Sequence, residues 1–99
     1  HLCRRTGLAE FPDCPTARGA KHLNELAKVA QSGHRAVLLY IVQRPDITAF
    51  QIAADIDPRY QAASFAAKAA GVQTLCYDCH VTTSGVTLRQ RLKIEDQDT

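Results

Sequence analysis

The 99-residue chain contains no Met and no Trp, and it has only three Tyr and three Phe. With so few aromatic side chains, a core has to be built from Leu, Val, Ile and Ala. The longest strongly apolar run, Ala36–Val42, has seven residues, whereas a transmembrane helix needs roughly 20. No secretory signal peptide is recognisable. These absences favour a globular protein that does not span a membrane.

The length fits one domain with a modest core. A hydrophobic content of 45% and a charged content of 22% are ordinary for globular proteins and do not indicate disorder. Because the chain begins with His1 and holds no Met, we expect it to be an internal piece of a longer protein. Without a secretory context, the four Cys are expected to be reduced thiols.

Local signals predict two helices. Thr16 is a suitable N-cap for a helix that runs to about Ser32 and stops at Gly33. Asp57 followed by Pro58 predicts the start of a second helix, which is expected to run to about Ala70 and to stop at Gly71. In the first helix the apolar residues at helical spacing are Leu23, Leu26, Ala27 and Ala30.

Strands are predicted around these helices at 1–5, Ala36–Val42, Val72–Val81 and Val86–Leu92, with turns at 6–7 and 83–85. Residues 43–56 are expected to be a long connection and 94–99 a frayed tail. The alternation of strands and helices predicts an α/β fold, with a mixed sheet and flanking helices. Since Ala36–Val42 is apolar on both faces, we expect it to be an interior parallel strand.

Cys76-Tyr77-Asp78-Cys79-His80 has the C-x-x-C-H pattern of a c-type haem attachment site. The string lies in a predicted strand, however, where residues three apart point to opposite faces. The same geometry argues against zinc, and although Cys3, Cys14 or His80 could complete a four-ligand site, their spacing matches no standard zinc pattern. The interpretation favoured here is two half-buried thiols with no metal.

Positive charge is concentrated in residues 1–44, which carry seven Lys/Arg against three acids, whereas the other 55 residues carry five against seven. Four charged residues recur along one face of the first predicted helix: Arg18, Lys21, Glu25 and Lys28. One interpretation is a solvated face with a weak Lys21–Glu25 pair. The other places Arg18 and Lys21 near a helix N-terminus, which favours phosphate. The spacing alone leaves both open.

The acids Asp55 and Asp57 do not make a convincing catalytic pair, because Asp57 is explained as a cap and Asp55 as an exposed loop residue. The Ser and His residues show no recognisable nucleophile–base arrangement.

The run Phe11-Pro12-Asp13-Cys14-Pro15-Thr16-Ala17-Arg18-Gly19-Ala20-Lys21-His22-Leu23 resembles the signature segment of the sugar fermentation stimulation protein A family. The similarity continues through 33–39, 42–46, 56–58 and 70–72, so that it covers essentially the whole chain. The resemblance implies that residues 1–99 are the C-terminal portion of a restriction-endonuclease-like, DNA-binding domain. It further implies a cytoplasmic protein linked to transcription regulation of sugar (maltose) metabolism.

The family resemblance also implies candidate site residues and a partner. The partner would be duplex DNA, contacted mainly through phosphates, and no membrane is implied; the oligomeric state is left open. On this resemblance the candidate DNA-binding residues are Asp13, Thr16, Arg18, Lys21 and His22, and Arg4 and Arg5 join them if the end of the first strand meets the helix start.

The catalytic motif of a nuclease-like core, an Asp and a Glu-x-Lys, would lie just upstream of His1. We therefore expect no catalytic residue, no cofactor and no cleavage activity in these 99 residues. The alternative function is a divalent-metal-dependent nuclease in the intact protein, with magnesium as its cofactor and its carboxylates upstream.

Overall fold

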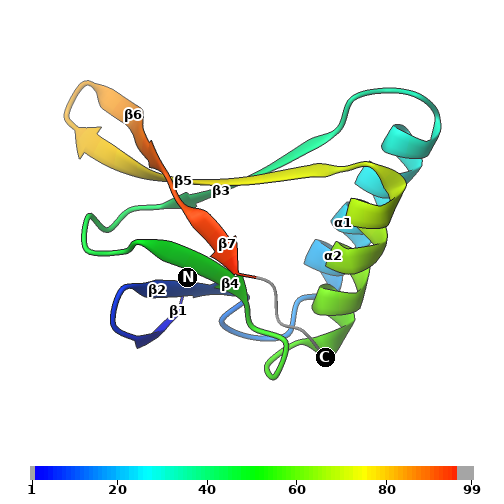
Figure 1. Ribbon diagram of the computed structural model, residues 1–99, viewed down its shortest axis with the longest axis horizontal. Coiled ribbons are helices and arrows are strands. Elements are labelled where there is room, and N and C mark those ends of the chain that lie inside the picture. The colour runs from blue at the N-terminus through cyan, green and yellow to red at the C-terminus, as the bar shows by residue number, and fades with distance from the viewer. Residues whose placement is uncertain (1, 96–99) are drawn as a thin grey trace.

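The computed structural model describes residues 2–95 (Figure 1). In chain order the elements are β1 (Leu2–Arg5), β2 (Leu8–Phe11), α1 (Ala17–Gln31), β3 (Val37–Val42), β4 (Ala49–Ile52), α2 (Pro58–Ala70), β5 (Gln73–Thr82), β6 (Gly85–Arg91) and β7 (Lys93–Glu95). The predicted α/β class is confirmed, with two helices among mixed strands.

The strands form two sheets rather than the single sheet expected. Sheet A has the order β1-β2-β4-β7, and sheet B has the order β3-β5-β6. Both sheets are mixed, because each contains parallel and antiparallel pairs. The predicted antiparallel hairpin at the carboxyl end of the fold is β5–β6, and its parallel neighbour is β3.

The prediction that Ala36–Val42 forms an interior strand is wrong. Among the described residues β3 pairs only with β5, so it lies at an edge of sheet B. Its side chains alternate between exposed and partly buried up to the buried Val42. Apolar residues on both faces predict burial on both sides, but only one face of β3 is covered.

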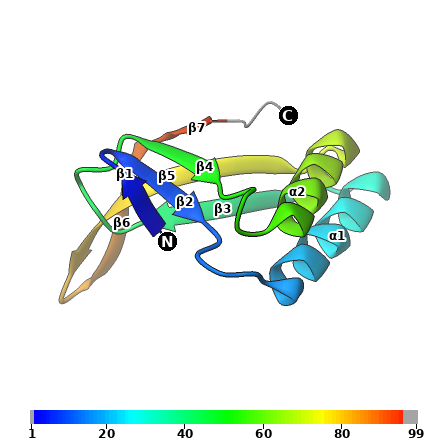
Figure 2. The same ribbon diagram turned by 90° about the horizontal axis from the view of Figure 1, so that it is seen from below.

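Both helices stand side by side at one end of the two sheets (Figures 1 and 2). One apolar cluster lies between the sheets and is formed by Ala9, Val42, Ile47, Phe50, Cys76 and Leu92. A second cluster joins the helices to the strand ends and is formed by Leu23, Ala36, Tyr60, Ala63, Ala67 and Val72. Phe11, Tyr40 and Ile52 pack against both clusters and connect them.

The helix signals in the sequence are confirmed at both ends of each helix. The Thr16 side chain accepts the N–H of Gly19 and caps α1, and Asp57 caps α2 by accepting the N–H of Tyr60. Gly71 takes the left-handed conformation that ends α2, with φ of 106°. In α1 the predicted apolar stripe faces the second cluster, with Leu23 fully buried.

Asp57 also ties the two helix starts together. One oxygen accepts the Tyr60 N–H at 3.0 Å, and the other accepts the Thr16 N–H at 2.8 Å. The close approach requires Gly19, because a Cβ at that position would lie 2.9 Å from the Thr16 side chain and 3.0 Å from the Tyr60 ring. The amino ends of α1 and α2 are therefore held next to each other.

Three short strands were not foreseen: β2, β4 and β7. The first follows the correctly predicted turn at residues 6–7, the second lies in the predicted long connection, and the third replaces the start of the predicted tail. Residues 96–99 of that tail lie outside the described residues. Within the described part of the chain, no helix is both long and apolar enough to cross a membrane.

Replacing Asp57 by Ala removes the acceptor for both the Thr16 and the Tyr60 N–H groups. We expect the free energy of unfolding, measured by urea denaturation, to fall by about 1 to 2 kcal/mol. The matched control is Asp55→Ala in the same loop, which should cost much less because Asp55 is exposed and surface ion pairs are screened. Equal losses in the two variants would contradict the bridging role of Asp57.

The contribution of Asp57 should also depend on pH. Hydrogen bonds, above all the one from the Thr16 N–H, hold the pKa of Asp57 below its usual range. A depressed pKa in the folded state means that the stabilisation is complete above the unfolded-state pKa of about 4 and is lost as the pH falls through the folded-state value. The stability difference between wild type and Asp57→Ala should therefore shrink in acid.

Candidate nucleic-acid interface

The amino ends of α1 and α2 border an open hollow of about 370 Å³. Its lining includes Thr16 and Lys21 from the α1 side and Arg59 from the α2 side. The two caps do not engage the N–H groups of Ala17 and Arg18, which lie at N1 and N2 of α1. Backbone N–H groups at this position carry the positive end of the helix dipole.

The charged residues that line this hollow are Lys21, Arg59 and Asp57. Arg18, Lys21 and His22 are exposed on the first turns of α1, and Arg59 is exposed on the first turn of α2. Neither helix has an acidic residue in its first turn. The acid nearest to both helix starts is Asp57, which is buried and accepts backbone N–H groups. The structure thus brings four of the predicted residues, Thr16, Arg18, Lys21 and His22, to one helix end.

Arg59 was missed by sequence reasoning. The signal was present, because Arg59 directly follows the Asp57-Pro58 helix start, just as Arg18 follows the start of α1. What the sequence does not reveal is that the two starts lie together, which depends on a hydrogen bond between residues 41 positions apart.

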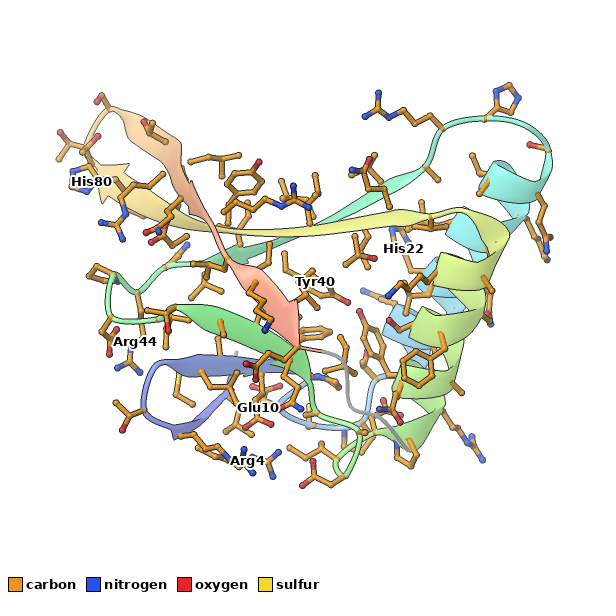
Figure 3. All side chains as sticks on the ribbon, in the orientation of Figure 1. Arg4, Glu10, His22, Tyr40, Arg44 and His80 are labelled. Carbon is orange, nitrogen blue, oxygen red and sulfur yellow. The ribbon has the colours of Figure 1, made fainter. Side chains whose placement is uncertain are left out.

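Arg4 occupies a different environment, on β1 (Figure 3). Its guanidinium binds Glu10 at 3.0 and 2.8 Å and Asp55 at 2.6 and 2.9 Å, each through two nitrogens. Glu10 is buried, so Arg4 is the counter-ion of a desolvated carboxylate. The hydrogen bonds from Arg4 lower the pKa of Asp55 to about 2. Asp55, expected to be a plain loop residue, is exposed but holds Arg4 in place.

The remaining candidates are exposed but are not gathered with the α1 residues. Arg5 lies with Arg4, Glu10, Gln51 and Asp55 around a second hollow, which shares no residue with the hollow at the helix ends. Asp13 lies in the segment between β2 and α1. The structure therefore divides the predicted site into a group on β1 and a group on α1.

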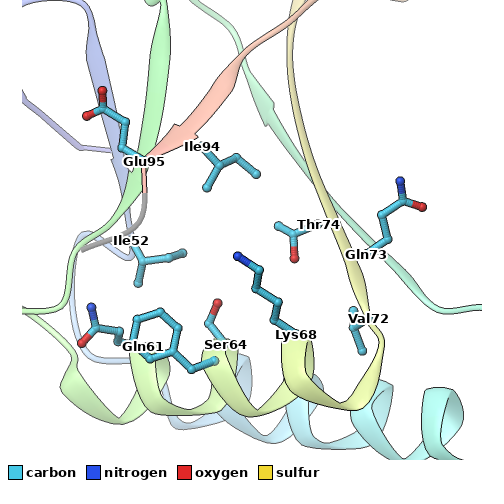
Figure 4. Close-up of a pocket in the computed structure, with 10 residues that line it drawn as sticks. Ile52, Gln61, Ser64, Lys68, Val72, Gln73, Thr74, Ile94 and Glu95 are labelled. Atoms are coloured by element: carbon cyan, nitrogen blue, oxygen red, sulfur yellow. The ribbon is translucent and has the colours of Figure 1, made fainter. Parts of the chain in front are cut away.

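A further pocket of about 280 Å³ lies between α2 and the strands β5 and β7 (Figure 4). Its apolar walls include Ile52, Val72 and Ile94, and Lys68 reaches into it from α2. None of the predicted site residues lines it.

Asp78 is a fully buried acid on β5. One oxygen accepts the Gln90 N–H at 2.7 Å, and the other accepts the Arg89 guanidinium. The Arg89 hydrogen bond is the main cause that holds the pKa of Asp78 below its usual range. The pairing register of β5 and β6 shifts at this point. Asp78 thus accepts a backbone N–H group and pairs with a guanidinium where sheet B is irregular.

Residues 1–85 match the family described as "Sugar fermentation stimulation protein RE domain", which is most of the chain. The chain belongs to the sugar fermentation stimulation protein family. It is similar to the homologue from Roseobacter denitrificans, with 55% identity over 93 residues, and to that from Jannaschia sp., with 53% identity over 95 residues. The matches cover 94% and 96% of this chain.

A solved structure of SfsA from Pyrococcus furiosus, in complex with Ca²⁺, matches with a TM-score of 0.83 and 33% identity. The match covers 95% of this chain and 41% of the archaeal one. The chain likewise spans about 40% of the length of the bacterial relatives. Family and fold are thereby shown for this chain, whereas the whole relatives contain much that lies outside the match.

The C-x-x-C-H string at residues 76–80 is part of strand β5 in sheet B. Cys76 and Cys79 lie within β5, and both are buried, whereas the sequence predicts half-buried thiols. Cys76 belongs to the cluster between the sheets, where burial raises the pKa of its thiol to about 11. Cys79 is not part of that cluster. No group of three or more potential metal ligands occurs within residues 2–95.

We expect the purified protein to contain no stoichiometric zinc and no covalent haem at Cys76 and Cys79, because a strand directs residues three apart to opposite faces. Elemental analysis and visible absorption spectroscopy test this expectation. In the native state only the exposed Cys14 should react rapidly with a thiol reagent. One zinc per chain, released together with newly reactive Cys76 and Cys79, would show the interpretation to be wrong.

Proposed function

We propose that this chain binds duplex DNA through the phosphate backbone, using the paired amino ends of α1 and α2. The observation that carries the proposal is the hollow between the helix starts, with Lys21 on one side and Arg59 on the other. Arg18 extends the basic surface along α1, and His22 is exposed on the same part of the helix. A role in transcription regulation of sugar metabolism, in the cytoplasm, follows as a proposal from the family resemblance.

The chemistry of this end of the molecule suits phosphate oxygens. Helix N-termini bind anions through backbone N–H groups, and the caps leave those of Ala17 and Arg18 directed outward from α1. Arg and Lys side chains add charge-assisted contacts. Such contacts position a protein on DNA without reading bases, so we propose binding that tolerates many sequences.

Arg4 has a smaller part in this proposal than the α1 residues. Its donors already bind Glu10 and Asp55, and a phosphate would have to compete with both carboxylates. Arg5, which neighbours it, has no such ion pair among the contacts of the described residues. Of the two β1 residues, Arg5 is therefore the better candidate for a phosphate contact.

A second candidate function is a divalent-metal nuclease in the intact protein. The observation that favours it is the solved Pyrococcus furiosus relative, which was determined with Ca²⁺. In this chain Glu10 and Asp55 are paired with Arg4, and Asp57 and Asp78 accept backbone N–H groups. The metal-binding carboxylates of such an enzyme are therefore proposed to lie upstream, as the family resemblance implies.

The affinity for duplex DNA should fall steeply with salt if phosphates are the contacts. Each phosphate that is neutralised contributes a slope of about −0.9 in a plot of log K against log salt. Replacing both Arg18 and Lys21 by Ala should flatten the slope by up to about 1.8, measured by fluorescence anisotropy with a labelled duplex.

The matched control also removes one Lys and one Arg, but near the carboxyl end of α1 and in the segment that follows it. Lys28→Ala with Arg35→Ala changes exposed residues at and beyond the last turn of that helix. This double variant should keep the wild-type slope within about 0.5, because its side chains lie away from the hollow. Binding that does not depend on salt, or an equal loss in both double variants, would contradict the proposed interface.

The chain should bind DNA without cutting it. Metal-assisted cleavage of a phosphodiester needs carboxylates that hold the ion beside an attacking water. Supercoiled plasmid incubated with the purified chain and magnesium should therefore remain supercoiled in gel electrophoresis. Magnesium-dependent nicking that co-purifies with the chain, and that Glu10→Gln abolishes, would place the chemistry within these residues instead.

A further inference from the structure

One face of sheet B points away from sheet A (Figure 1), and many of its side chains are apolar, although Gln73 and Arg91 also belong to it. On the edge strand β3 the outward side chains are Val37, Leu39 and Ile41, which are 41%, 42% and 46% exposed. In the strand register Leu39 lies beside Leu75, and Ile41 beside Tyr77. Further along the sheet are Val81, Val86 and Leu88, so that six of the eight large hydrophobic residues found exposed within residues 2–95 lie in sheet B.

The open edge of β3 has the same character. Each of the other three sheet edges in the described part of the chain carries charge: Arg4 and Arg5 on β1, Arg89 and Arg91 on β6, and Lys93 and Glu95 on β7. β3, with the sequence VLLYIV, contains neither a charged residue nor Pro. Natural proteins protect exposed edges with charges or Pro, because an open apolar edge pairs with other chains. An edge without such protection is typical of a strand that has a neighbour.

The relatives are long enough to provide that neighbour. The matched region is about 40% of the Roseobacter denitrificans homologue and 41% of the Pyrococcus furiosus chain. A second copy of this chain fits less well. Pairing two β3 edges would extend the sheet but would leave the apolar face of each copy in water. A longer polypeptide is able to supply both a strand for the edge and a segment for the face.

We propose that the edge of β3 and the outer face of sheet B are an interface for the part of the family polypeptide that lies outside the matched region. One of its strands adds to β3 by backbone hydrogen bonds, and an apolar segment covers Val37, Leu39 and Ile41. The interface is separate from the hollow at the helix ends, whose lining contains no residue of sheet B.

The test compares this chain alone with a chimera of the Roseobacter denitrificans homologue in which this chain replaces the matched region. Hydrogen exchange should slow at least tenfold at the β3 amides in the chimera, because the open edge becomes paired. Unchanged exchange at β3 would overturn the strand-pairing part of the proposal.

Two matched substitutions test the face. Val37→Lys and Val29→Lys change the same residue type at the same exposure, 41%, on β3 and on α1. Val37→Lys should lower the unfolding midpoint of the chimera markedly but that of the chain alone only slightly, whereas Val29→Lys should have a similar small effect in both. Equal effects of Val37→Lys in the two proteins would overturn the proposal. Sedimentation of the chain alone gives a second check. A dimer that Val37→Lys dissociates would also overturn the proposal, because the face would then bind a second copy.

Discussion

The carboxylate of Asp57 fixes the end of the molecule at which both helices begin. It accepts the N–H of Tyr60 in its own helix and that of Thr16 in the other, and so sets the position of one helix start relative to the other. Gly19 permits the approach, since any larger residue would meet Tyr60. The positive ends of two helix dipoles consequently share one surface, and Lys21 and Arg59 lie on either side of it.

What the sequence predicts well is local. Caps, turns and helix stops depend on residues within a few positions of one another, and this is why Thr16, Asp57 and Gly71 are placed correctly. The strands β2, β4 and β7 have three or four residues each, too few to show a periodicity. They are fixed by pairing with strands some 40 residues away in the chain, which no local pattern records.

The candidate site likewise has a part that the sequence predicts and a part that depends on the fold. The α1 residues could be recognised from one helix start and its charges, whereas the contribution of Arg59 depends on tertiary structure. Arg4 shows the opposite case, because its charge looks available in the sequence but is balanced by Glu10 and Asp55 in the fold. The buried Glu10 requires a counter-ion at this position, and the nearest basic residue in the hairpin supplies it.

Because the net charge of the chain is only +2, the positions of the individual basic residues matter. A chain so close to neutrality exerts little long-range attraction on a polyanion, so an anion-binding surface requires cations gathered at one place. The folded chain pairs Arg4, Arg44 and Arg89 with acids on the strands and the loop after β3. Arg18, Lys21 and Arg59 stay exposed where two helix dipoles already favour anions. Acids thus pair with cations on the strands, whereas at the helix starts Asp57 is turned to backbone N–H groups and the cations around it stay exposed.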